Sequence, residues 1–204
     1  SIAVSNGLQQ YAKARYNIDT KLIPNGVSLP ELKEVKNIEK WGLEKDNYIV
    51  AISRLIRHKG VHYLIEAYKN IKTDKKLVIV GEGYFTDDYV NELKELAKDN
   101  KNIIFTGNQT GETLAELFSN AYLFAQPSEP EGLSIALLEA MSYKRAVLVS
   151  HIQKNKEPIG NVGLTFENKN TSDLEEKLPC LYFSFSRKSC QMKAQELARQ
   201  HLFK

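Results

Sequence analysis

From residue 48 onward, short apolar runs alternate with stretches in which apolar residues recur with the period of a helix. The apolar runs predict strands at 48–53, 76–81, 102–107, 122–128, 145–150 and 163–166. The periodic stretches predict helices at 60–72, 87–99 and 111–121, and a further helix that contains Glu139. Strands that are apolar on both faces, each followed by a helix, indicate a parallel sheet covered on both sides. The predicted fold class is α/β, a doubly wound parallel sheet with a Rossmann-like layout.

The two ends of the chain differ from this body. Residues 1–26 predict a strand and a helix followed by "KLIPNG", whereas residues 30–47 are charged and irregular, as in a connector. Residues 179–204 combine an aromatic run, "LYFSF", with a basic helical stretch. We therefore expect a separate N-terminal part at 1–26, the sheet domain at 27–178 and a helical tail at 179–204.

Composition bears on three points: nucleic-acid binding, metal binding and cellular location. The 204 residues carry 28 basic and 25 acidic side chains, a balance that gives no support to a nucleic-acid partner. Cys180 and Cys190 form no CxxC pair and have no histidine cluster nearby, so we expect free thiols and no metal site. No apolar run reaches membrane-spanning length and the first residues lack the layout of a signal peptide, so the expected location is cytoplasmic.

The stretch "SRLIRHKG" (53–60) contains the first candidate site residues. It follows a predicted strand and leads into a helix, so Arg54 and Lys59 are expected at the carboxyl edge of the sheet, where doubly wound folds bind ligands. A guanidinium and an ammonium group near a helix N-terminus favour an anion site. The alternative is a solvated basic loop, because Arg57 and His58 lie in the same stretch.

A second candidate is "EGLSI" (131–135), at another strand-to-helix junction. Gly132 allows a ligand to approach the backbone closely, and the amides of Leu133, Ser134 and Ile135 are first-turn donors without helical partners. The alternative is structural: Gly132 makes a turn and Ser134 caps the helix.

Two carboxylates accompany these donors. Glu131 and Glu139 are eight residues apart, which leaves a rotation of only about 80° on a helix, so both can face one ligand. Glu139 lies among Ile135, Leu137, Leu138, Ala140 and Met141, where an unpaired charge is costly. Paired hydroxyls, as on a ribose, would supply donors to it. The alternatives are a salt bridge or exposure on the polar side of the helix.

Other signals are weaker. "GEGYFT" (81–86) begins like a dinucleotide fingerprint but lacks the last glycine and follows a middle strand, so we assign it no cofactor. Phosphate-binding GxxxxGK[ST] and hydrolase G-x-S-x-G motifs are absent, as is a D-x-D pair for a metal–diphosphate. The aromatic side chains of Tyr63, Tyr68, Tyr84 and Tyr89 are expected to pack.

Taken together, the spaced residues resemble a known family. The sequence is similar to the C-terminal, nucleotide-sugar-binding half of retaining GT-B glycosyltransferases of family 4, over roughly residues 1–178. The stretches that carry this resemblance are "IPNGV" (23–27), "SRLIRHKG" (53–60), "VIVGEG" (78–83), "IIFTG" (103–107), "AYLFAQPSEPEGLSIALLEAM" (121–141) and "VGLTF" (162–166). The resemblance implies transfer of a sugar from a nucleotide-diphosphate sugar to an acceptor, with retention of configuration.

The resemblance also implies roles for individual residues. Arg54 and Lys59 would hold the diphosphate and neutralise the leaving nucleotide, with help from backbone donors near Leu133, so that no metal or other cofactor is required. Glu139 would bind the ribose hydroxyls, and Glu131 would contact the transferred sugar. Backbone groups near Gln109 would lie at the edge of the base. Arg54, Lys59 and Glu131 would thus act nearest the reacting bond.

Departures from the family pattern set further expectations. Lys144 stands where relatives have glycine after the helix, and a left-handed conformation there would cost about 1 kcal/mol. Residues 1–26 resemble only the end of an N-terminal acceptor domain and its linker, so we expect donor binding but little transfer by this chain alone. The acceptor, a sugar or a lipid-linked sugar, would bind that missing domain, and a basic face would suit the inner membrane surface. A non-catalytic nucleotide-binding or interaction module remains the alternative.

Overall fold

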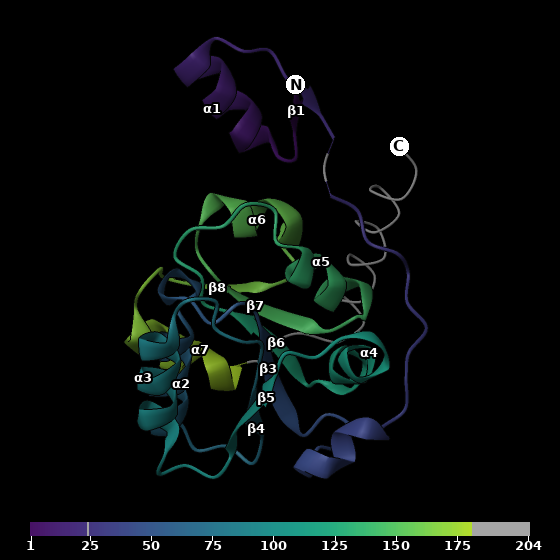
Figure 1. Ribbon diagram of the computed structural model, residues 1–204, viewed down its shortest axis with the longest axis vertical. Helices are drawn as coiled ribbons and strands as arrows, with labels where there is room; N and C mark the ends of the chain where they lie inside the picture. Colours follow the sequence, from purple (N-terminus) through teal and green to yellow (C-terminus); the bar gives the residue numbers. More distant parts are fainter. Residues whose placement is uncertain (24, 181–204) are drawn as a thin grey trace.

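The computed structural model describes residues 1–23 and 25–180, and its centre is a six-stranded parallel sheet (Figure 1). The chain returns to the middle of this sheet halfway through, so that strands are added first on one side and then on the other. This confirms the predicted doubly wound α/β class. Across the sheet the strands are β5 (Ile103–Gly107), β4 (Lys76–Val80), β3 (Tyr48–Ile52), β6 (Leu123–Gln126), β7 (Ala146–Ser150) and β8 (Leu164–Phe166).

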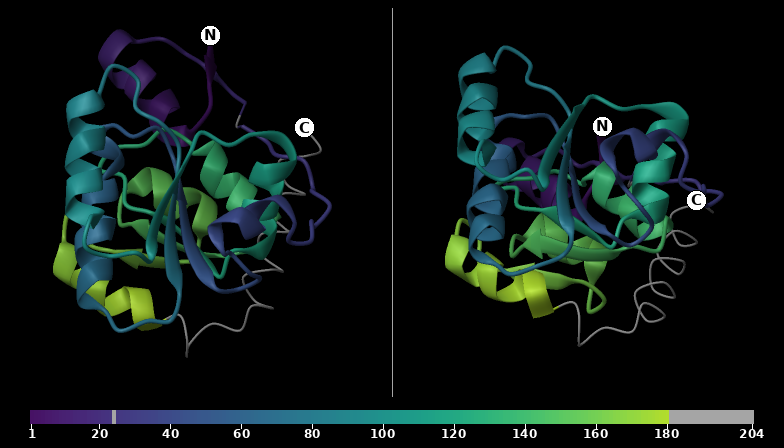
Figure 2. Two further views of the ribbon diagram at one scale, coloured as in Figure 1. Left: turned by 60° about the horizontal axis from the view of Figure 1, so that its bottom comes forward. Right: turned by 90° about the horizontal axis from the view of Figure 1, so that it is seen from below.

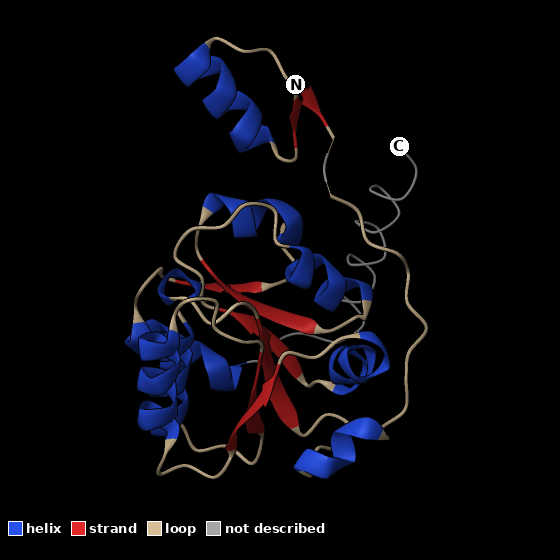
Figure 3. Ribbon diagram, in the orientation of Figure 1, coloured by secondary structure: helices blue, strands red, loops and turns tan. Residues whose placement is uncertain are grey.

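Helices cover both faces of the sheet, as Figures 2 and 3 show. One layer consists of α2 (Val61–Asn70), α3 (Asp87–Ala97) and α7 (Thr171–Cys180). The other consists of the 3₁₀ helix η1 (Asn37–Trp41), α4 (Gly111–Asn120), α5 (Ile135–Ser142) and α6 (Gln153–Ile159).

The central strands are apolar on both faces because both layers need a core. On β3, Ile49 and Ala51 pack against the α2 layer, whereas Tyr48 and Val50 pack against the α4 layer. The point where strand order reverses lies between β3 and β6, which are direct neighbours. In doubly wound sheets the crevice at such a switch point, at the carboxyl ends of the strands, is the usual ligand site.

The N-terminal residues form a separate unit of β1 (Ile2–Ala3), α1 (Asn6–Tyr16) and β2 (Lys21–Leu22), with its own two-stranded sheet. In Figure 1 this unit lies beyond α6, and the chain then runs along the side of the molecule to η1. The predicted division at residue 26 stays a prediction. Most of the predicted tail, together with Cys190, lies outside the described residues, and the side chain of Cys180 is likewise not described.

The connector at 30–47 was expected to be irregular, and in part this was wrong. Residues 37–41 form η1, and the side chains of Ile38 and Leu43 are fully buried. The physical reason is Glu116 on α4, whose carboxylate accepts hydrogen bonds from the backbone amides of Lys36, Asn37 and Ile38. A buried acceptor supplied from a distant helix is invisible to local sequence patterns.

Two further findings concern helix geometry. Lys144 has φ 61°, as its position after α5 predicted, and a non-glycine residue in this region carries a cost of about 1 kcal/mol. Among the described residues, no helix has the length and apolar character needed to cross a bilayer.

Candidate functional site

Two loops meet at the switch point of the sheet. The β3 loop (residues 53–60) includes a 3₁₀ turn, η2 (Arg57–Lys59), which ends at Gly60 with φ 69°. A Cβ at Gly60 would lie 2.1 Å from the carbonyl oxygen of Pro127, in the β6 loop (residues 127–134). The backbone amide of Glu129 also donates to the carbonyl of His58 at 2.8 Å. Glycine at position 60 therefore allows the two loops to touch.

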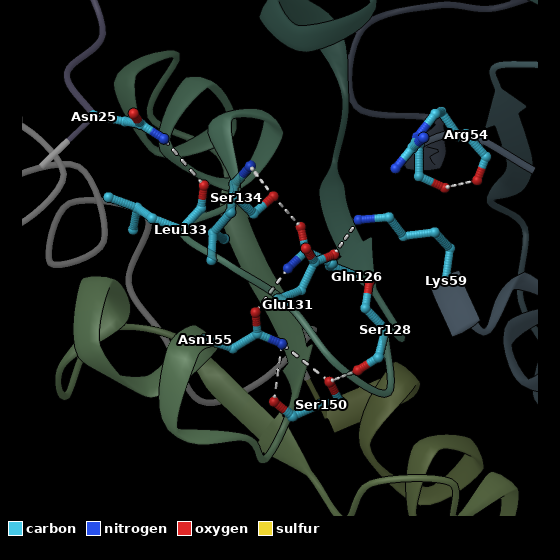
Figure 4. A network of polar contacts seen from close by, with 12 residues as sticks. Asn25, Arg54, Lys59, Gln126, Ser128, Glu131, Leu133, Ser134, Ser150 and Asn155 are labelled. Atoms are coloured by element: carbon cyan, nitrogen blue, oxygen red, sulfur yellow. Dashed lines mark hydrogen bonds and ion pairs between the residues drawn. The ribbon is translucent and has the colours of Figure 1, made fainter. Parts of the chain in front are cut away.

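This contact brings Lys59 and Glu131 together, as Figure 4 shows. The Lys59 ammonium lies 2.6 Å from Glu131 Oε1, and the two side chains are only 16% and 8% exposed. The residues are 72 positions apart in the chain, so the pair depends on the fold. A largely buried cation and carboxylate therefore form a polar centre at the carboxyl edge of the sheet.

Arg54 and Gln109 belong to a neighbouring pocket. They line a cavity of about 260 Å³ over the ends of β3, β4 and β5, together with Asn108 and residues 80–84. The Arg54 side chain is exposed and forms no hydrogen bond or ion pair with any described residue. The site thus presents a free guanidinium on one side of Lys59.

Within the same loop Arg57 is paired with another element, whereas the exposed Arg54 is still compatible with the alternative of a solvated basic loop. The Arg57 guanidinium pairs with Glu92 on α3 and lies 4.9 Å from the ring centroid of Tyr89. It is therefore engaged away from the switch point. Arg54, in contrast, lines the pocket, and the Lys59 ammonium is directed to Glu131.

The beginning of α5 differs slightly from the prediction. The helix starts at Ile135 instead of near Leu133, because Ser134 is its N-cap and accepts a hydrogen bond from the Leu137 amide. The Ser134 hydroxyl also donates to Gln126 Oε1 at 2.6 Å. The Ser134 hydroxyl is therefore engaged as a cap and the Ser134 carbonyl accepts from the Leu138 amide, so only the Ser134 backbone amide remains available to a ligand.

The backbone donors themselves are open. Within the described residues, the amides of Leu133, Ser134 and Ile135 have no hydrogen-bond acceptor. Gly132 does not have a positive φ, so a turn does not require glycine there, and no heavy atom lies within 4 Å of a Cβ placed on it. The open space beside Gly132 fits the close approach of a ligand better than the turn interpretation.

A buried chain of polar side chains supports this loop from below (Figure 4). Gln126 Nε2 donates to Asn155 Oδ1 at 2.8 Å, and Asn155 Nδ2 donates to both oxygens of Ser150. The Ser150 hydroxyl donates to the Ser128 carbonyl at 2.5 Å. This chain fixes the start of α5 to β7 and α6. Sequence analysis missed it, although Gln126 inside an apolar strand was a usable signal.

Glu129 is a second residue that sequence analysis missed. Its carboxylate accepts from the Tyr63 hydroxyl at 2.9 Å and pairs with the Lys169 ammonium at 2.6 Å. The hydrogen bond from Lys169, and then that from Tyr63, hold the pKa of Glu129 below its ordinary value. Glu129 thus ties the β6 loop to α2 and to the turn after β8.

Within the described residues, the carboxylate of Glu139 has no partner. Its side chain is half-buried on α5, and it accepts no hydrogen bond and forms no ion pair with any described residue. Burial raises the pKa of this carboxyl group above its ordinary value. The salt-bridge alternative therefore finds no support within the described residues. As for metals, the described part of the chain contains no group of three or more His, Cys, Asp or Glu side chains suited to an ion.

The chain is similar to known proteins in both sequence and structure. A family model described as "Glycosyl transferases group 1" matches residues 33–182. The "N-acetylgalactosamine-N,N'-diacetylbacillosaminyl-diphospho-undecaprenol 4-alpha-N-acetylgalactosaminyltransferase" of Campylobacter jejuni is 32% identical over 154 residues, which are 71% of this chain and 41% of that protein. The O-antigen chain mannosyltransferase RfbU of Salmonella typhimurium is 28% identical over 169 residues, 80% of this chain and 45% of that protein.

Solved structures share the fold. Anabaena HepE, solved in complex with UDP and glucose, aligns with a TM-score of 0.84 at 23% identity, covering 98% of this chain and 58% of that one. The chain spans less than half the length of the curated relatives described above.

Proposed function

Because the chain belongs to the group 1 glycosyltransferases, we propose that it forms the donor-binding half of a retaining enzyme. The donor would be a nucleotide-diphosphate sugar. The observation that carries the proposal is the meeting of Lys59 and Glu131 at 2.6 Å where the order of strands reverses. A cation for phosphate and a carboxylate for sugar hydroxyls then lie where doubly wound folds bind nucleotides.

The roles of the side chains follow from their chemistry. Arg54 and Lys59 would contact the diphosphate and stabilise the charge that develops on the leaving nucleotide. Lys59 has three donors, so it can keep Glu131 and still bind a phosphate oxygen. The open amides at the start of α5, from Leu133 to Ile135, would add donors that require no rearrangement.

The carboxylates would orient the sugars. Glu131, held by Lys59, would accept from hydroxyls of the transferred sugar, and Glu139 would accept from the ribose. The surroundings of Gln109 would meet the base, because that residue lines the pocket with Arg54. The hydroxyls of a ribose at Glu139 would supply the hydrogen-bond donors that its carboxylate lacks among the described residues.

The acceptor would bind elsewhere. The name of the Campylobacter relative includes diphospho-undecaprenol, a lipid carrier, which supports a lipid-linked sugar as one class of acceptor. We infer that transfer requires an acceptor-binding half in addition to the residues described. A transferase assay in which this chain alone turns over a nucleotide sugar would contradict that inference.

Donor binding is tested by calorimetric titration of the chain with UDP, GDP and ADP, with NAD as a negative control. We expect one nucleoside diphosphate to bind, and Arg54→Ala to weaken it at least tenfold, since a charge-assisted contact contributes roughly 1.5–3 kcal/mol. Arg57→Ala is the matched control, because Arg57 lies in the same loop but pairs with Glu92. Equal losses in both variants, or no binding by the wild type, would overturn the proposal.

A further inference from the structure

The β4 loop (residues 81–86) places two aromatic side chains in solvent. Tyr84 is 69% exposed and Phe85 is 91% exposed. The expectation that the tyrosines pack holds for Tyr68 and Tyr89, which are 3% and 5% exposed, and Tyr63 is partly buried. For Tyr84 it was wrong. Two adjacent exposed aromatic residues gain little from folding, so their placement needs another cause.

The base of this loop is held firmly against the loop that carries Arg54. A Cβ at Gly81, where φ is 135°, would lie 1.9 Å from the Ser53 carbonyl oxygen. The Thr86 hydroxyl donates to the Leu55 carbonyl at 2.8 Å and accepts from the Tyr84 amide at 3.2 Å. The aromatic side chains therefore extend from a fixed support.

The tip of the loop is strained. Phe85 has φ 54°, a left-handed conformation that costs a non-glycine residue roughly 1–2 kcal/mol. Its ring contacts that of Tyr84 edge to face, with centroids 4.5 Å apart. Strain of this kind persists where the surrounding structure enforces it and gathers at ligand sites.

Tyr84 also lines the 260 Å³ pocket, whereas Phe85 does not. The lining of the pocket also includes Ile52 and Val80, the last residues of β3 and β4, and Gln109. A pocket whose lining combines apolar residues, an aromatic ring and polar side chains suits a flat ring with polar edges. A nucleobase has this form.

We propose that Tyr84 stacks on the base of the donor nucleotide and so contributes to nucleotide affinity independently of the diphosphate contacts. This inference rests on the proposed function, because it places the base in the pocket that Arg54 shares. The edge-to-face contact with Phe85 steadies the Tyr84 ring. Stacking depends on the ring and not on its hydroxyl, which gives a direct test.

The test compares two ligands on the full chain by calorimetry: the nucleoside diphosphate that binds best, and base-free ribose 5-diphosphate. For Tyr84→Ala we expect the first to bind roughly 5- to 150-fold more weakly, the loss typical of one base–aromatic stack. The affinity for ribose 5-diphosphate should not change. Tyr84→Phe should match the wild type, as should the matched control Tyr11→Ala, whose side chain is 56% exposed on α1.

The outcomes separate the two proposals. If the wild type binds a nucleoside diphosphate and Tyr84→Ala binds it equally well, the stacking role is overturned and the donor site stands. The same holds if Tyr84→Ala weakens both ligands to the same degree, because the effect then does not involve the base. If the wild type binds no nucleoside diphosphate, both proposals fail.

Discussion

At the residue scale, Glu139 shows how function and stability oppose each other. Its carboxylate is half-buried without a donor among the described residues, and burial raises its pKa above the ordinary value of 4.5. Between the unfolded and folded pKa values, the folded chain binds more protons than the unfolded chain, so stability falls as pH rises through that window. At neutral pH the ionised carboxylate is therefore a cost to the fold.

We predict that Glu139→Gln raises Tm at pH 7, by on the order of 1–2 °C for a chain of this size. The gain should shrink as pH falls below 4.5 and disappear near pH 3, where both states carry a protonated carboxyl group. Calorimetry at the two pH values measures this, with the exposed Glu44→Gln as control. A lower Tm at pH 7 would show that Glu139 has a stabilising partner. A variant that gains stability while losing nucleotide binding is the expected signature of a functional residue.

The site residues differ in how far the sequence could predict them. Lys59 and Glu131 were expected at one edge of the sheet because both follow strands whose carboxyl ends share it, and the structure brings the two side chains to 2.6 Å. Their roles toward a donor stay predictions. The structural alternative that Ser134 caps the helix is confirmed. Its hydrogen bond to Gln126 could not be foreseen, because Gln126 lies on a strand whose register only the folded sheet sets.

At the scale of elements, the strands were predictable and their connections less so. Apolar residues on both faces identified the strands to within one or two residues. Helix α6 was not predicted, because "QKNKEPI" has no apolar periodicity and includes Pro158. Helix η1 was missed because the amides at its start are bound by Glu116, a residue on another helix. On the amphipathic helix α4 a glutamate is expected on the exposed face, but the Glu116 side chain is only 1% exposed.

Glu116 therefore gives a test of how the connector is held. Burial raises the pKa of this carboxyl group, but hydrogen bonds from the amides of residues 36–38 and from the Asn37 side chain outweigh it, and the net pKa is lowered. A lowered folded-state pKa means that the stabilisation is present above the unfolded value and is lost as pH falls through the folded value.

We predict that Glu116→Ala destabilises the chain by roughly 1–3 kcal/mol at pH 7, because buried amides lose their acceptor. Urea denaturation at pH 7 and below pH 4 should show the difference from the wild type shrinking in acid. The control is Glu112→Ala on the same helix, where the side chain is exposed and the effect should be well under 1 kcal/mol. A pH-independent loss would mean that the hydrogen bonds of the carboxylate are not the cause.

At the scale of the whole molecule, the N-terminal unit and the sheet domain are joined lightly. Helix α1 has no buried residue. The unit meets α6 through hydrogen bonds from Lys154 to Ser5 and from Asn6 to Glu157, each 2.7 Å long. Contacts of this kind contribute about 0–1.5 kcal/mol each. The cores described for the sheet domain include no residue of the unit.

We therefore predict that removing residues 1–22 changes the free energy of unfolding by less than about 2 kcal/mol and leaves a single cooperative transition. Urea denaturation of the two chains measures this, and the denaturant slope should fall only slightly, because that slope follows the surface exposed on unfolding. Lys154→Ala in the full chain is the control, since it removes one of the two bonds without shortening the chain. A much larger loss of unfolding free energy on truncation would show that the N-terminal unit and the sheet domain unfold as one cooperative body. The predicted boundary at residue 26 would then be wrong.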